Sequence, residues 1–170
     1  MAEPSTLYKL MILYMLKKVN FPLSNPQLWT FFDEKGYTNY FTFQNVIGQL
    51  KDANLLTAET VRNMVLYEIT PQGEDALYYF SNDISPAIKE ELDAYLTENS
   101  FRMRNETGIT SDYYRTEDRE YMVHARVREG KRVLFEMNIS VPTEDQARVL
   151  CEHFEQKAQT IYAYVMNHLT

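Results

Sequence analysis

Two short strand-like segments inside a helical pattern limit what this chain can fold into more than any other feature. Residues 56–61 and 64–69 are rich in apolar and β-branched side chains, and only Arg62 and Asn63 separate them. Two strands joined by two residues form an antiparallel hairpin. The sequence therefore predicts a hairpin with Arg62 and Asn63 at its tip.

Helical periodicity surrounds this hairpin on both sides. Apolar residues recur every three or four positions in four segments of the first 80 residues, in this order: 5–18, Ser24 or Asn25 to Gly36, 38–54, and Thr70 to Phe80. Asn54 suits the end of the third helix, because asparagine tolerates the left-handed conformation. Three helices, a hairpin and a fourth helix are the order of a winged helix, whose second and third helices form a helix-turn-helix.

Short polar segments at residues 81–83 and 85–86 follow, so we expect one domain over residues 1–81 and a second over 82–170. The second domain is expected to hold these elements: a helix from about Pro86 to Asn99, strands over 109–115, 119–128 and 132–141, and a final helix of roughly 25 residues beginning with a capping box at Thr143 to Gln146. The expected fold class is α+β: an N-terminal winged helix-turn-helix followed by a small antiparallel three-stranded sheet packed on a long C-terminal helix.

The alternation of the last two strands predicts which of their residues face each other. One face of each strand is apolar, and a shift by one residue would turn the two apolar faces to opposite sides. A three-residue loop, Glu129-Gly130-Lys131, keeps the apolar faces together. It predicts three apolar pairs: Val127 with Val133, Ala125 with Phe135, and Val123 with Met137. The same register places His124 opposite Glu136 on the other face.

The polar side of the third helix is the candidate DNA-reading surface. An α-helix fits the major groove, where Gln and Asn pair with adenine and Thr bonds a base or a phosphate. With its apolar residues toward the core, this helix turns four polar side chains outward: Thr42, Gln44, Asn45 and Gln49. Tyr40 at the start of the helix is placed for a phosphate contact, and Arg62 at the hairpin tip for a phosphate or the minor groove. Asn63 beside it completes the predicted DNA-binding set.

The charge of the chain limits how it can bind nucleic acid. The 170 residues hold 17 Lys and Arg against 24 Asp and Glu, a net charge of -7. This sign excludes a protein whose whole surface binds nucleic acid, so DNA contact would use a local patch. The same balance favours an alternative function, a winged-helix adaptor that contacts proteins and does not bind DNA.

Two runs of this sequence carry a family resemblance. IGQLKDANLL before the hairpin and YEITPQGEDAL after it resemble the recognition helix, wing and following helix of MarR-like and PadR-like winged-helix regulators, over roughly Ser5 to Phe80. Asn54 replaces the glycine that is common in their pattern. The whole chain, through YTNYFTFQNVIGQL and ISVPTEDQARVLCEHF, resembles the domain-of-unknown-function family 4364. These resemblances imply a bacterial-type transcription regulator with a winged-helix module and an α/β C-terminal part.

Candidate groups for catalysis or metal binding are few and dispersed. The single cysteine, Cys151, cannot form a disulfide within the chain, and on a helix it points in a different direction from His153. Cys151 is next to the apolar stripe of the final helix, so we expect it to be partly buried. Burial in apolar surroundings makes a thiol unreactive. We therefore expect no enzyme activity, no catalytic residue, no metal and no cofactor.

The expected partners follow from the same reading. They are double-stranded DNA, a second copy of the chain, and a small-molecule effector of unknown identity. The final helix is longer than three short strands can cover, so its part near Ile161 to Leu169 is expected to help form a homodimer. A cluster of four cations near a strand end suits an anionic effector: Arg126, Arg128, Lys131 and Arg132. No apolar run approaches the roughly 18 residues of a bilayer span, so we expect a cytoplasmic protein with no membrane partner.

Overall fold

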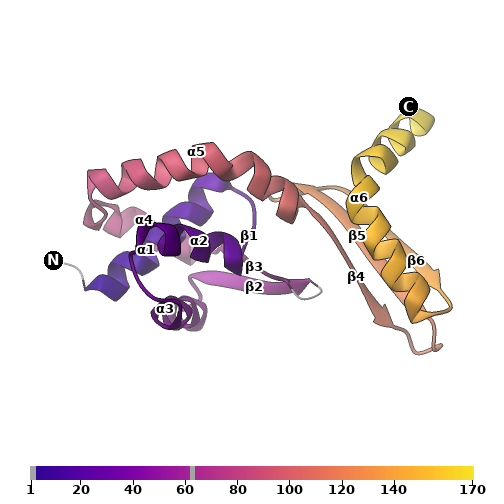
Figure 1. The fold of residues 1–170 in the computed structure, drawn as a ribbon, viewed down its shortest axis with the longest axis horizontal. Helices are drawn as coiled ribbons and strands as arrows, with labels where there is room; N and C mark the ends of the chain where they lie inside the picture. The colour runs from indigo at the N-terminus through magenta and orange to yellow at the C-terminus, as the bar shows by residue number, and fades with distance from the viewer. Residues whose placement is uncertain (1–2, 62–63) are drawn as a thin grey trace. The chain divides into compact units, whose positions relative to one another are not determined.

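The computed structural model describes residues 3–61 and 64–170, so the hairpin tip at Arg62 and Asn63 lies outside the described residues. Two compact units make up the chain, one of residues 3–60 and 64–107 and one of residue 61 with residues 108–170 (Figure 1). The described part of the chain is mixed α+β, with six α-helices and two three-stranded sheets. Across these described ranges, no helix combines the length and the apolar composition that crossing a bilayer requires.

The first unit holds the helices and strands that the sequence predicts before residue 81. Its elements, in chain order, are α1 (Pro4–Val19), β1 (Leu23–Ser24), α2 (Asn25–Lys35), α3 (Tyr40–Asp52), β2 (Leu56–Val61), β3 (Met64–Ile69), α4 (Pro71–Phe80), a 3-10 turn (Ser81–Asp83) and α5 (Pro86–Gly108). The strands lie in the order β1-β3-β2, and β1 pairs antiparallel with β3, with Leu23 opposite Tyr67. The expected left-handed end at Asn54 (φ 59°) is confirmed, and Gly36, where the second helix is expected to end, is also left-handed (φ 69°).

Helix α1 lies at the centre of the first core. Its apolar side chains Met11, Ile12 and Met15 are fully buried, as a helix that is apolar around most of its circumference requires. Phenylalanines of the next two helices pack into the same cluster, with Phe31 and Phe32 from α2 and Phe43 from α3. The core of this unit therefore joins the first three helices of the chain.

Helix α5 belongs to this core and is longer than the sequence analysis expects. It continues past Asn99 to Gly108, because neither glycine nor proline interrupts residues 100–107 and Met103 is buried. Leu92, Tyr95 and Leu96 of α5 also lie in the cluster around α1. The compact units consequently divide at 107/108, whereas the expected domain boundary lies at 81/82.

A backbone crossing closes the base of the hairpin. The hydroxyl of Thr70 donates to the carbonyl of Asn54 (2.7 Å), and the Thr70 N–H donates to the carbonyl of Leu55 (3.1 Å). The same hydroxyl accepts the N–H of Gly73 (3.0 Å) and so caps α4. A Cβ atom at Gly73 would stand well inside the van der Waals contact distance of the Leu55 carbonyl oxygen. Only glycine therefore lets the start of α4 approach the start of β2 so closely.

The second unit is a three-stranded antiparallel sheet packed on a long C-terminal helix. Its elements are β4 (Ile109–Arg115), β5 (Tyr121–Glu129), β6 (Arg132–Val141) and α6 (Glu144–Leu169). β5 begins two residues later than expected, because Arg119 adopts a left-handed turn conformation (φ 64°). Helix α6 begins at the predicted cap, where the Thr143 hydroxyl accepts the N–H of Gln146 (3.2 Å). Cys151 of α6 is fully buried against Val123 of the sheet.

The register predicted between β5 and β6 is wrong. The three central apolar pairs are Val127 with Phe135, Ala125 with Met137, and Val123 with Ile139. The strands turn at Gly130 and Lys131 with Glu129 opposite Arg132, which is a two-residue loop and not the predicted three-residue loop. An irregularity between Val127 and Arg128 then shifts the register.

The assignment of residues to the two faces is nevertheless correct for Tyr121 to Val127 and for Phe135 to Val141, and it is wrong for Val133, which lies opposite Arg128. A two-residue turn followed by one extra residue in β6 moves the partners of Val127 and of the earlier residues of β5 by two positions, and side chains alternate with period two. His124 lies opposite Asn138, and its Nε2 contacts the Glu136 carboxylate diagonally instead of directly. Turn length alone therefore does not decide the pairing, because a bulge compensates for it.

Two glycines of the first unit should respond oppositely to substitution. We predict that Gly73→Ala destabilises the protein by about 1–3 kcal/mol, because the new methyl group overlaps the Leu55 carbonyl oxygen. Gly48→Ala in α3 should stabilise it by up to about 1 kcal/mol, because a Cβ at Gly48 meets no atom within 4 Å and alanine favours a helix. Urea unfolding of the two variants measures both free energies, and equal effects would contradict the close approach at Gly73.

Candidate nucleic-acid interface

The four-residue connection between α2 and α3 sets the direction of α3. Gly36 ends α2 in the left-handed conformation, and the Asn39 side chain caps α3 by accepting the N–H of Thr42 (2.8 Å). On the inner side of α3, Phe43 packs against Trp29 and Phe32, with ring centroids 5.4 and 5.3 Å away. These contacts fix the rotation of α3 about its axis and turn its polar side outward.

The structure distributes the predicted DNA-binding residues over this outer side unequally. Asn45 and Gln49 are exposed one helical turn apart, and Tyr40 is also exposed. Thr42 and Gln44 are half-buried. The outer side of α3 thus brings five of the seven predicted residues together, while Arg62 and Asn63 lie outside the described residues.

Asn25 links two of the predicted residues to the rest of the first unit. The Gln44 Nε2 donates to Asn25 Oδ1 (2.8 Å), and the Asn25 Nδ2 donates to the Tyr40 hydroxyl (3.1 Å). The hydroxyl of Tyr67 on β3 donates to the same Asn25 Oδ1 (3.3 Å), and burial raises the pKa of Tyr67. This network joins α2, α3 and β3, so Gln44 and Tyr40 are held in place by an intramolecular partner.

Sequence reasoning considers Asn25 only as a helix cap. In the structure Ser24 caps α2, where it forms a capping box with Gln27. The bond from Asn25 to Gln44 spans 19 positions of sequence and depends on the angle between two helices. No local sequence pattern reports such an angle, which is why the role of Asn25 emerges only from the tertiary structure.

The outer side of α3 is uncharged over its first three turns. Its only charged residues are Lys51 and Asp52, both at the C-terminal end. Phe41 is 76% exposed and lies one turn before Asn45, and Gly48 lies about one turn after Asn45. Because Gly48 has no side chain, and a Cβ atom there would meet nothing within 4 Å apart from its own helix, the helix backbone is open to close approach at this position.

A tyrosine pair anchors the connection that precedes α3. The hydroxyl of Tyr8 on α1 donates to the carbonyl of Tyr37 (2.7 Å), and the hydroxyl of Tyr37 donates to Glu91 of α5 (2.6 Å). Burial and this bond to the Glu91 carboxylate raise the pKa of Tyr37 to about 12. The connection is thereby held from both sides by helices of the first unit.

Other chemistry-bearing side chains are dispersed over the second unit. Within residues 3–61 and 64–170, no three His, Cys, Asp or Glu residues are grouped so that they would hold a metal ion. The cations near the end of β5 lie among carboxylates, since Arg126 faces Glu136 in the register and Arg132 lies 3.9 Å from Glu129. Anion binding by these cations stays a prediction.

Comparison with known proteins identifies the chain at the level of a family. Residues 8–169 match the family described as "Domain of unknown function (DUF4364)", which is nearly the whole chain. No curated protein and no solved structure matches the chain.

The anchor at Tyr37 gives a pH dependence that can be measured. Because the pKa of Tyr37 is raised to about 12, its stabilising effect is complete below the unfolded value of about 10 and is lost as the pH rises toward 12. The stability advantage of the wild type over Tyr37→Phe, measured by urea unfolding, should therefore shrink over this range. Glu91→Gln keeps a hydrogen-bond acceptor but removes the charge. The stability advantage of Glu91→Gln over the Tyr37→Phe, Glu91→Gln double variant should therefore begin to shrink at a lower pH. An advantage that stays constant from about pH 9 to 12 would contradict the bond to Glu91.

Proposed function

The chain belongs to the DUF4364 family, and we propose that its first unit is a winged helix that binds double-stranded DNA and regulates transcription. In this proposal α3 is the recognition helix and the β2–β3 hairpin is the wing. The second unit forms a homodimer and responds to a small-molecule effector. The protein acts in the cytoplasm, where bacterial DNA is found.

The observation that carries this proposal is the topology of residues 4–80. Three helices precede the hairpin, and the two-residue strand β1 between α1 and α2 pairs with β3. The second and third helices are joined by four residues beginning with Gly36, which is the connection typical of a helix-turn-helix. The sheet order β1-β3-β2 attaches the hairpin to the strand between α1 and α2. In the chain, the hairpin directly follows α3.

The outer side of α3 supports base reading in particular. Asn45 and Gln49 are exposed amides on successive turns, and such side chains form two hydrogen bonds with adenine in the major groove. The first three turns of α3 carry no carboxylate to repel phosphates. The opening at Gly48 allows the helix backbone to come close to a base edge or a phosphate.

A specific observation also favours the alternative, a protein-interaction adaptor. Phe41 lies exposed in the first turn of α3, on its outer side. Tyr78 and Tyr79 of α4 are 81% and 79% exposed. Aromatic side chains are enriched at protein–protein interfaces. The excess of 24 acidic over 17 basic residues weakens nucleic-acid binding in general.

Selection of genomic fragments with the purified full chain distinguishes the two functions. It should be done at low and at physiological salt, because phosphate contacts weaken steeply as salt rises. Enrichment of a shared sequence supports DNA binding. Recovery of no sequence at either salt concentration would contradict the proposal and leave the adaptor as the function to test.

On an enriched site, the exposed amide of α3 should contribute to specificity. We predict that Asn45→Ala weakens binding to that site by about 1–3 kcal/mol and binding to random DNA little, because one pair of base hydrogen bonds is lost. Fluorescence anisotropy with the two DNAs measures both affinities. Gln72→Ala, which removes an exposed amide from α4, is the matched control and should change neither affinity.

Arg62→Ala tests the hairpin tip in the same assay. If Arg62 contacts one phosphate, the variant should bind all DNA sequences more weakly. The slope of log affinity against log salt concentration should fall by about one. Loss of affinity on the specific site alone would remove Arg62 from that role. An equal loss on both DNAs for Asn45→Ala would likewise remove Asn45 from base reading.

The end of α6 should mediate dimer formation. Beyond Ile161 the helix exposes Tyr164 and Leu169, and Leu169 is 79% exposed. We predict a homodimer at tens of micromolar that becomes monomeric in a Tyr164→Glu, Leu169→Glu double variant, because charges are then placed in an apolar contact. Light scattering measures the mass, with Gln159→Glu as the control on an exposed position of α6. A wild-type monomer would contradict the prediction.

A further inference from the structure

A pocket of about 350 Å³ lies between the end of α1 and the middle of α5 in the first unit. Its inner wall is apolar, with Phe21 and Leu96 buried and Val19 half-buried. The polar groups come from α5, where Thr97, Ser100 and Arg104 are spaced so that they share one side of the helix. The volume falls at the lower end of the range for small-molecule sites, about 300–1,000 Å³.

The charges at one end of the pocket compensate each other. Lys18 lies 4.0 Å from Asp93, and Asp93 also accepts a hydrogen bond from the hydroxyl of Tyr14 (2.6 Å). Burial, together with this bond, raises the pKa of Tyr14, so Tyr14 stays a donor to the carboxylate. The Asp93 charge is therefore already engaged by groups of the chain itself.

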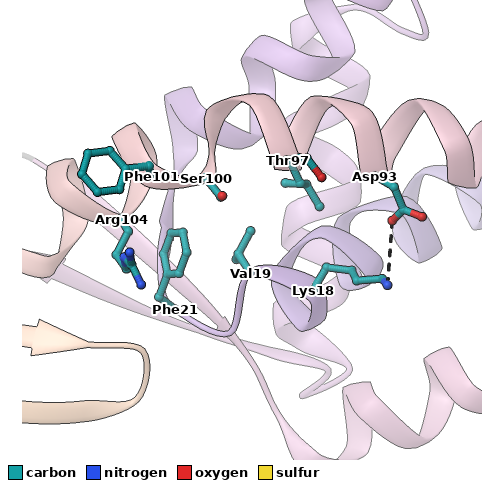
Figure 2. Close-up of a pocket in the computed structure, with 9 residues that line it drawn as sticks. Lys18, Val19, Phe21, Asp93, Thr97, Ser100, Phe101 and Arg104 are labelled. Carbon is teal, nitrogen blue, oxygen red and sulfur yellow. Dashed lines mark ion pairs between the residues drawn. The ribbon is translucent and has the colours of Figure 1, made fainter.

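The other end of the pocket has a cation without a counterpart. Arg104 is half-buried, and among residues 3–61 and 64–170 it forms no ion pair. Figure 2 shows Arg104 beside the ring of Phe21, with Ser100 and Phe101 at the same end and the Lys18–Asp93 pair at the opposite end. Along α5, Asp93 and Arg104 are eleven residues apart, roughly 16 Å, so Asp93 does not neutralise Arg104.

We propose that this end of the pocket binds a small monocarboxylate with an aromatic or branched apolar body. The guanidinium group of Arg104 forms paired hydrogen bonds with a carboxylate, and the Ser100 hydroxyl supplies a further donor at the same end. The ring of Phe21 contacts the apolar body. The lining carries the charges of Lys18, Asp93 and Arg104, which sum to +1, so one negative charge on the ligand gives neutrality.

The proposal does not rest on DNA binding. It concerns a site formed by α1 and α5, whereas the proposed base contacts come from α3. Binding of the carboxylate is measured on the protein alone. Failure of one proposal is therefore distinguishable from failure of the other.

The test uses 2-naphthoate as the probe and 2-naphthamide as its neutral counterpart. Both are titrated into the full-length protein and followed by NMR chemical-shift changes of backbone amides. We expect 2-naphthoate to bind with a dissociation constant in the millimolar range or tighter and to shift the amides of Phe21, Ser100 and Arg104. The amide should bind about tenfold more weakly, because it cannot form the charge-assisted bonds to Arg104.

Variants on neighbouring positions of α5 separate the pocket from a general charge effect. Arg104→Gln should weaken 2-naphthoate about tenfold and leave 2-naphthamide nearly unchanged. Arg102→Gln is the matched control, since Arg102 pairs with Glu106 (3.1 Å) and does not line the pocket. If Arg104→Gln does not fold, Ser100→Phe fills the same end and should abolish binding.

Three results would overturn the proposal. The first is an absence of saturable shifts up to about 10 mM 2-naphthoate, since such a site would bind no carboxylate of this class usefully. The second is equal affinity for the acid and the amide. The third is an Arg104→Gln protein, folded by its melting temperature, that binds 2-naphthoate as the wild type does.

Discussion

The crossing of the α4 start over the Leu55 carbonyl is the constraint on which the first unit depends. It brings together the end of α3, the start of β2 and the end of β3 within one set of hydrogen bonds made by the hydroxyl and the N–H of Thr70. The hairpin is thereby tied at its base to two helices. The tie adds to the pairing with β1 and to the core contacts of Leu56, Tyr67 and Ile69, and an isolated hairpin is marginally stable.

The outer side of α3 is held in position by contacts between α3 and other elements of the first unit. Phe43 anchors it in the core, the Asn25 network holds its first turn, and Tyr37 fixes the connection before it. Side chains that are held in this way lose little conformational entropy when a partner binds. This support is common to both functions weighed above, because DNA and a protein partner each benefit from a rigid surface.

Helix α5 contributes to more than one property of the first unit. Its buried face completes the core around α1, and its half-exposed face forms the wall that carries Arg104. A cation that is held partly out of water beside an aromatic ring, and that forms no ion pair within residues 3–61 and 64–170, interacts more strongly with a bound anion than an exposed lysine does. The same helix therefore accounts for the stability of this core and for the chemistry of the pocket.

The sequence by itself determined the elements of this protein and the faces of most of them. Periodicity, caps and the left-handed positions Gly36 and Asn54 are local properties, so the order of helices and strands followed from them. Parity likewise assigned the faces of β5 and β6, because it survives any shift by two residues.

Tertiary structure alone decided the rest. The bulge that sets the β5–β6 pairing depends on how two neighbouring strands fit together. The membership of α5 in the first core, the bonds of Asn25 and the pocket at Arg104 depend on contacts between different elements. Such contacts are decided by packing and by angles between elements, and neither leaves a periodic mark in the sequence.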